Sequence, residues 1–290
     1  MKPAPFDYHA PATLAEAVSL LAELDDAKVI SGGQSFVPLM NLRLASVSNL
    51  VDLRRVGELR GIERRGDSLW IGAATTHATV ERSAEVAAAV PLLARAIPLI
   101  GHFQIRNRGT IGGSIAHADP AAEIPAVALA LDARLEAASP RGTREIAAGE
   151  FFEGVWTTAL ADDEILTGVR FPIWSGRCGA AVEEITRRHG DFAIAGACVA
   201  VQIDAAGAVT RSAISLLGLG STPLRATTAE QSAVGTAAGA VDAVALGQAA
   251  VADLTNIPTD SNGSAAYRAR IGATVVTRAW TRAIEEALRG

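Results

Sequence analysis

The stretch GTIGGSIAHADPAAE, residues 109–123, is polar and rich in glycine, and apolar segments precede and follow it at 94–100 and 124–131. Adjacent glycines let a ligand approach the backbone closely. Glycines also adopt backbone dihedral angles that other residues avoid. Their exposed N–H groups are able to form a concave site for an anion. We therefore interpret this stretch as a ligand-binding loop between two buried segments.

A second polar glycine loop occurs earlier in the chain. Residues 27–30 predict a short buried strand, which runs directly into SGGQS at 31–35 and then into an apolar helix over 36–44. A strand that enters a Gly-rich turn before a helix commonly presents N–H groups to a phosphate. The loops match neither GxGxxG nor GxxxxGK[ST], so the signatures of a Rossmann site and of a P-loop are absent. On spacing alone, a plain surface turn is the alternative.

Composition excludes several classes of protein. The 290 residues are 49% hydrophobic and 20% charged, which is typical of a folded chain with room for more than one domain. A net charge of −5, no cluster of Lys or Arg and 4% aromatic residues argue against nucleic-acid binding. The N-terminus lacks the apolar run of a signal peptide, and no segment approaches the roughly 20 apolar residues that span a bilayer. We expect a cytoplasmic protein.

Hydrophobic periodicity predicts a mixture of helices and strands, with a boundary at 173–177 and a separate α+β unit after it. Helices are predicted over 13–24, 79–90, 91–97, 124–131, 227–252 (interrupted at Gly235 and Gly239) and 264–288. Strands are predicted over 49–53, 59–62, 68–73, 133–137, 144–146, 195–203 and 209–217. Residues 164–172 predict an edge strand that ends at a proline.

Few residues offer catalytic chemistry. GxSxG, HExxH and CxxC are absent, and Cys178 and Cys198 are isolated, which predicts no metal or iron–sulfur site in this chain. His117, Asp119 and Glu123 form only a generic polar set for a metal, and the two acids form a generic acid–base pair. The sequence instead favours binding, and an enzyme of this kind takes its chemistry from a cofactor.

Two arginines precede the second glycine loop. Arg106 and Arg108 either pair with a ligand phosphate or with nearby acids, and we predict that they are positioning charges at the surface.

Together the two loops carry a resemblance to a known family. SGGQS at 31–35 and TIGGS at 110–114 resemble the two FAD pyrophosphate loops of the flavoprotein subunit of molybdenum hydroxylases, which include carbon monoxide dehydrogenase and xanthine dehydrogenase. The similarity extends along the chain through FDY at 6–8, DLR at 52–54, GDFA at 190–193 and PLRA at 223–226. The pair of loops and these four further matches make the resemblance specific.

The resemblance implies a fold and an assembly. The expected fold is α+β, with a two-lobed FAD-binding domain of the vanillyl-alcohol-oxidase/PCMH type over 1–175 (lobes about 1–56 and 57–175). A smaller α+β C-terminal domain of the CO dehydrogenase flavoprotein type would follow over 176–290. The implied partners are a small subunit with [2Fe–2S] clusters and a large subunit with a molybdopterin cofactor, commonly as a dimer of heterotrimers. The large subunit would hydroxylate the substrate, and electrons would leave through FAD in this chain to an external acceptor.

The resemblance also implies which residues bind FAD. Two groups would wrap the pyrophosphate through backbone N–H groups and hydroxyls: Ser31, Gly32, Gly33, Gln34 and Ser35 from one side, and Thr110, Ile111, Gly112, Gly113 and Ser114 from the other.

Other positions of the family's site are carried over singly. Glu123 matches the acid near the ribityl hydroxyls, and Asp119 lies on the same loop. Ile100 and Gly101 match positions beside the flavin ring, and Leu166 matches an apolar position near the adenine. Phe192 falls where the carbon monoxide enzyme has a tyrosine over the isoalloxazine, so the ring packing is kept and a hydroxyl is lost.

The sequence bears on the substrate only through its similarity to the flavin subunits of particular hydroxylases. SIAHADP at 114–120 is more similar to flavin subunits of N-heteroaromatic hydroxylases than to the NAANGDP of the carbon monoxide enzyme, although substrate contacts belong to the large subunit. We therefore expect an N-heteroaromatic substrate, with CO or an aldehyde as alternatives.

Two other classes of protein compete with this interpretation. A stand-alone FAD-dependent oxidase or reductase of the same wider fold would need its own substrate domain and catalytic base, and the C-terminal segment is small and poor in polar clusters. A non-enzymatic nucleotide-binding module is disfavoured by the pairing of the two loops.

Overall fold

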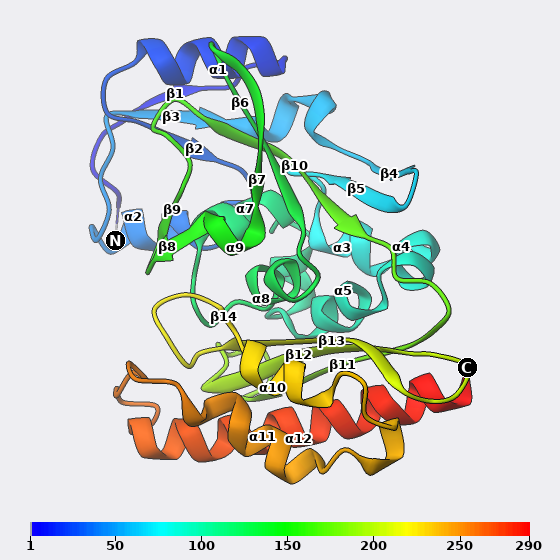
Figure 1. Ribbon diagram of the computed structural model, residues 1–290. Coiled ribbons are helices and arrows are strands. Elements are labelled where there is room, and N and C mark those ends of the chain that lie inside the picture. Colours follow the sequence, from blue (N-terminus) through cyan, green and yellow to red (C-terminus); the bar gives the residue numbers. More distant parts are fainter. Residues whose placement is uncertain (1) are drawn as a thin grey trace.

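The computed structural model describes residues 2–290, whose strands form four sheets (Figure 1). The first sheet is parallel, with the order β1–β3–β2, and contains β1 (Asp7–His9), β2 (Ala27–Ile30) and β3 (Asn49–Asp52). Helix α1 (Leu14–Glu23) packs on it through Ala17, Val18 and Leu21. The short helix α2 (Phe36–Asn41) follows β2, and the loop between them is SGGQS.

The second sheet is antiparallel, with the order β4–β5–β10–β6–β7. Its strands are β4 (Ile62–Arg65), β5 (Ser68–Gly72), β6 (Arg134–Ser139), β7 (Gly142–Ala147) and β10 (Ile165–Pro172). The prediction of an edge strand at 164–172 is wrong, because β10 is the central strand. Pro172 is its last residue and pairs with Ser68, so the missing N–H falls where the ladder ends.

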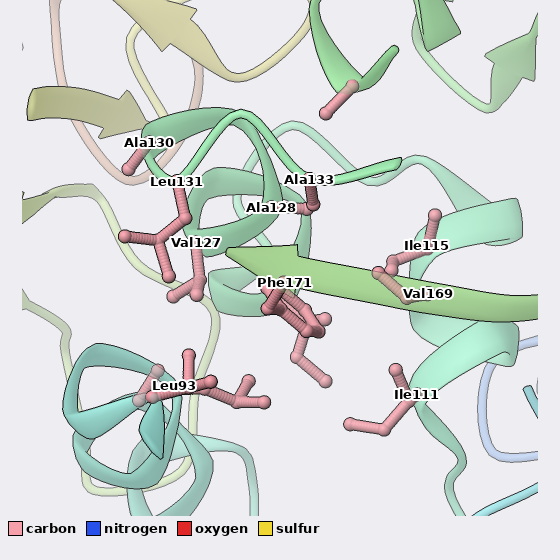
Figure 2. Packing of buried hydrophobic residues seen from close by; sticks show 14 of the residues in the cluster. Leu93, Ile111, Ile115, Val127, Ala128, Ala130, Leu131, Ala133, Val169 and Phe171 are labelled. Carbon is pink, nitrogen blue, oxygen red and sulfur yellow. The ribbon is translucent and has the colours of Figure 1, made fainter. Parts of the chain in front are cut away.

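Helices cover the face of this sheet that lies toward the C-terminal part of the chain (Figure 1). They are α3 (His77–Glu81), α4 (Ala84–Ala89), α5 (Pro91–Ala96), α6 (Phe103–Arg106), α7 (Ile111–His117), α8 (Glu123–Ala130) and α9 (Ala148–Phe151). Figure 2 shows apolar side chains of α5, α7 and α8 in one core with Val169 and Phe171 of β10. The small hairpin β8 (Phe152–Gly154) and β9 (Thr157–Thr158) and the 3-10 turns Leu53–Arg55, Gly57–Leu59 and Ile97–Leu99 complete this part.

The third layer is built by the C-terminal part of the chain. Its antiparallel sheet has the order β11–β12–β13–β14, with β11 (Arg177–Ile185), β12 (Ala195–Ile203), β13 (Val209–Leu217) and β14 (Leu224–Arg225). One face packs on α10 (Thr227–Ala233), α11 (Ala243–Ala252) and α12 (Ala265–Arg289), and a 3-10 turn spans Ala238–Ala240. The other face packs on α5 and α8 (Figure 1). The sheet is therefore a layer between two sets of helices.

Two helix predictions and one loop prediction need correction. The helix expected at 79–90 is two helices, α3 and α4, because the Ser83 hydroxyl accepts from the backbone N–H of Val86 and starts a new one. The Ala-rich helix expected at 227–252 breaks into α10 and α11 around Gly235, which has φ +82°. Residues 109–123 are not a loop throughout, since they contain α7, capped by Thr110.

Helix α8 joins the two parts of the chain. All eight of its residues are buried. Just before its N-terminus, Pro120 O accepts a hydrogen bond from Gly218 N of the C-terminal part, at 2.8 Å. At its other end Arg225 Nη1 donates to Leu129 O at 2.9 Å and pairs with Asp132. The C-terminal part therefore fixes α8 at both ends.

Within residues 2–290, no helix has both the length and the apolar character that crossing a membrane requires.

Candidate functional site

The two glycine segments, although far apart in sequence, touch each other. We call residues 31–35 the first glycine loop and residues 110–114 the second glycine segment. The hydroxyls of Ser31 and Thr110 are hydrogen-bonded at 2.8 Å. A Cβ atom on Gly32 would lie 2.3 Å from Arg108 O and 2.7 Å from Gly109 Cα, so the backbones meet where only glycine fits. The two segments form one structure.

The first glycine loop presents backbone donors that the protein does not use. Among the described residues, no hydrogen-bond acceptor is recorded for the N–H groups of Gly32, Gly33, Gln34 and Ser35. Gly33 has the left-handed φ of +72°, which lets successive N–H groups converge into a concave nest. The Gln34 side chain folds back on Gly32 O, and the Ser35 hydroxyl caps nothing at the start of α2. This arrangement suits a bound anion.

The second glycine segment is built differently, as the first turn of α7. The N–H groups of Ile111 and Gly112 donate to Thr75 O and Ala73 O, and that of Gly113 donates to the Thr110 hydroxyl. The backbone N–H groups of residues 111–114 are therefore already bonded within the protein. The segment supports the first glycine loop through the Thr110 hydroxyl and leaves the Ser114 side chain half-buried beside it.

His77 holds the second glycine segment in place through two hydrogen bonds. It is 4% exposed, and its Nε2 lies 2.9 Å from Thr110 O, while its backbone N–H donates to Gly109 O. Burial lowers the pKa of His77 to about 4, so the imidazole is neutral at pH 7. A carbonyl only accepts hydrogen bonds, so Nε2 carries the proton. Sequence reasoning missed this role, because a histidine in AATTHATV has no distinguishing motif.

We expect His77→Gln to reduce the loss of folding stability at acid pH. The folded-state pKa lies below the ordinary value of 6.5, so the stability that neutral His77 contributes is complete above 6.5 and is lost as the pH falls toward 4. Glutamine keeps an N–H donor and does not titrate. Urea unfolding at several pH values between 7.5 and 4.5 should therefore give a flatter stability profile for His77→Gln than for the wild type. The control His9→Gln, on strand β1, should keep the wild-type slope, and equal slopes for all three proteins would contradict the assignment.

Ile100 and Gly101 form a tight turn held by an arginine. Gly101 has φ +48°, and Arg106 Nη1 donates to Ile100 O at 3.1 Å and to Gly101 O at 3.3 Å. The other guanidinium nitrogens pair with Glu81 at 2.9 and 3.1 Å. The pairing of Arg106 with a nearby acid is confirmed, whereas its predicted place at the surface is wrong, because its side chain is only 13% exposed. A Cβ atom on Gly190 would lie 3.1 Å from Gly101 O, which brings the loop of Phe192 to the same turn.

Glu123 begins α8 as a buried acid with few partners. It is 8% exposed, and within residues 2–290 its carboxyl accepts no hydrogen bond from another residue. Burial, with smaller contributions from Glu184 and Asp119, raises its pKa to about 8. Burial also raises the pKa of Glu184 to about 7. Sequence reasoning missed Glu184 of β11, which influences Glu123 because the sheet that contains β11 packs on α8 through β12 and β13.

The remaining predicted residues lie at different depths. The Asp119 carboxylate accepts from Ala121 N at 2.9 Å and shapes the turn before α8. Leu166 is 5% exposed and belongs to the core beneath α7, so the structure does not bring it to the surface of the two glycine segments. Phe192 is 65% exposed. In the described part of the chain, no group of three or more His, Cys, Asp or Glu side chains is arranged to hold a metal ion.

The fold and the two joined glycine segments define a protein built to hold a ligand with a charged diphosphate-like group. A family model described as the FAD binding domain in molybdopterin dehydrogenase matches residues 4–174, and one described as the CO dehydrogenase flavoprotein C-terminal domain matches residues 180–283. The chain belongs to this family of FAD-binding medium subunits of molybdenum hydroxylases.

Individual relatives support the same assignment over the whole length. The chain is 43% identical to the 6-hydroxypseudooxynicotine dehydrogenase complex subunit alpha of Paenarthrobacter nicotinovorans, covering 99% of this chain and 97% of that protein. It is similar to carbon monoxide dehydrogenase from Hydrogenophaga pseudoflava, with a TM-score of 0.94, 38% identity and 99% of each chain covered. Quinoline 2-oxidoreductase from Pseudomonas putida 86 gives 0.93 and 34%, covering 99% of this chain and 100% of that one. The expected α+β fold with two domains is confirmed.

Proposed function

We propose that this chain is the FAD-carrying electron-transfer subunit of a heterotrimeric molybdenum hydroxylase. The observation that carries the proposal is that the four backbone N–H groups of residues 32–35 have no hydrogen-bond acceptor in the described chain. The loop that contains them is hydrogen-bonded to the second glycine segment. These donors fit the pyrophosphate of FAD, because they converge and belong to a loop with no other use for them. The membership of the FAD-binding family supports the same ligand.

Each part of the site has a role toward FAD in this proposal. The first glycine loop binds the pyrophosphate through N–H groups, and the Ser31 and Thr110 hydroxyls keep it in place. Glu123, which is buried and lacks a partner from another residue, faces the ribityl hydroxyls. Ile100, Gly101 and Phe192 border the flavin ring. The bound FAD supplies the redox chemistry, and the chain contributes binding and orientation.

The remaining assignments in the second glycine segment and elsewhere belong to the same proposal. Ile111, Gly112, Gly113 and Ser114 line the pyrophosphate from the second side, where Ser114 offers its hydroxyl and the others offer close backbone approach. Asp119 orients the turn that leads to Glu123, and Leu166 supports the adenine end from within the core.

The proposed assembly follows the relatives. Medium chains of this kind belong to enzymes named as dehydrogenase complexes, and their cofactors include a molybdenum cofactor. We place a small [2Fe–2S] subunit and a large molybdopterin subunit beside this chain, as a dimer of heterotrimers, with electrons passing from the clusters through FAD to an external acceptor. The relatives that act on nicotine derivatives and quinoline favour an N-heteroaromatic substrate.

Two further assignments belong to the proposal. We place the boundary between the FAD-binding domain and the C-terminal domain at 175/176, which is supported by the end of β10 at Pro172 and the start of β11 at Arg177 in a different sheet. A cytoplasmic location agrees with the two free cysteines, Cys178 and Cys198.

The experiment is purification of the tagged chain together with its natural partners. An oxidised-flavin absorbance spectrum with about one FAD per chain, and iron and molybdenum in the same complex, would support the proposal. A chain that binds FAD but recovers no iron–sulfur or molybdenum protein would favour the stand-alone oxidase or reductase. A colourless chain that takes up no added FAD would contradict both.

A further inference from the structure

The loop between β11 and β12, residues 186–194, is anchored at its base in the C-terminal domain. Ile194 N–H donates to Ile185 O at 2.7 Å, which closes the hairpin. The buried Arg268 of α12 donates to Ile194 O and, at 2.9 Å, to Gly218 O. The base of this loop is therefore fixed to its own domain.

The tip of the same loop rests on the FAD-binding domain. Gly190 has φ +83°, and a Cβ atom there would lie 3.0 Å from the His102 ring and 3.1 Å from Gly101 O. Next to it, the rings of His189 and His102 lie nearly parallel, 5.8 Å between centroids with planes 8° apart. This offset arrangement lies within the range in which aromatic rings attract each other. The contact joins two domains at the turn assigned to the flavin ring.

The two sides of this contact are held by different interactions. His102 follows the Ile100–Gly101 turn, whose carbonyls Arg106 holds. His189 lies at an exposed position of a hairpin tip, where the backbone bond recorded nearby is Asp191 N to Arg188 O at 3.1 Å. The stacked pair therefore fixes the tip against the turn. Phe192 is three residues after His189 and 65% exposed, so its position depends on that of the tip.

We propose that His102 and His189 form a clasp between the two domains, and that this clasp positions Phe192 beside Ile100 and Gly101 so that small solutes reach the flavin ring slowly. The two histidines are positioning residues and leave the pyrophosphate untouched. The proposal rests on the proposed function, because the ring that it shields belongs to FAD. Restriction of solvent access by a closed loop is a general way of controlling a reactive group.

The test measures access to the bound flavin in the FAD-loaded complex. The flavin is reduced with dithionite, and its reoxidation by dissolved oxygen is followed by absorbance. We expect His189→Ala and His102→Ala each to be reoxidised about fivefold faster than the wild type. The double variant should be no faster than either single variant, since the two side chains form one contact. His189→Phe, which keeps a ring, should remain close to the wild type.

Arg188→Ala, next to His189 in the same loop, is the matched control and should behave as the wild type, because within residues 2–290 the Arg188 side chain forms no hydrogen bond or ion pair. FAD content, measured by absorbance, should be unchanged in every variant. Wild-type rates in both alanine variants, additive rates in the double variant, or loss of FAD from them would overturn the clasp. A wild-type complex that holds no FAD would instead overturn the proposed function.

Discussion

Gly32→Ala is expected to bind FAD about 100-fold more weakly than the wild type. The added Cβ would lie 2.3 Å from Arg108 O, so the first glycine loop must move away from the second glycine segment. Overpacking by a methyl group typically costs about 1–3 kcal/mol, and each 1.4 kcal/mol changes affinity about tenfold. Reconstitution of the apoprotein with FAD, followed by fluorescence titration, measures the effect. Gly33→Val and Gly113→Val should abolish FAD retention by filling the same cradle.

The control for this prediction is Gly149→Ala in α9, where an added Cβ would meet nothing within 4 Å. It should bind FAD like the wild type. Circular dichroism should show that the loop variants keep the secondary structure of the wild type, because the strained contact lies between loops. Normal FAD affinity in the three loop variants would contradict the assignment of the cradle.

Glu123→Gln should stabilise the FAD-free chain at alkaline pH. Because the folded-state pKa of Glu123 is about 8, the stability associated with its neutral form is complete below 4.5 and is lost as the pH rises from 4.5 to 8. Glutamine resembles the neutral acid and does not ionise. The melting temperature at pH 9 should therefore be about 10 °C higher in Glu123→Gln than in the wild type, given about 1.4 kcal/mol per pKa unit and about 2–4 °C per kcal/mol.

The same comparison at pH 5 should show almost no difference. Glu150→Gln, at an exposed position of α9, is the matched control and should follow the wild type at both values of pH. If Glu123→Gln and the wild type lost stability in parallel between pH 5 and pH 9, Glu123 would not be the buried acid described above.

The elements with strong periodicity could be predicted from the sequence. Strands β12 and β13 and the long helix α12 were expected almost within their observed limits, because their apolar residues recur at the spacing of one buried face. Strand β11, RCGAAVEEI, was not expected, since its small and charged residues carry no alternation and its partners come from β12 and α12. The central place of β10 depends on β6, which no local pattern reveals.

The candidate site, like the fold, could be predicted only in part from the sequence. Both glycine segments stand out in the sequence, because glycine, serine and threonine gather between apolar runs. The bond between Ser31 and Thr110, the support from His77 and the stack of His102 on His189 join segments that are distant in sequence. Such contacts depend on the packing of whole layers. A single sequence contains the residues that make them and no sign of their pairing.

The hydrogen bond between Ser31 and Thr110 has a consequence for the order of assembly. With both segments joined to each other, the receptor for FAD is complete when the polypeptide has folded, and little loop entropy remains to be lost on binding. The folded chain would then meet FAD with its binding segments already in place, so that binding of the cofactor need not be coupled to folding of these segments.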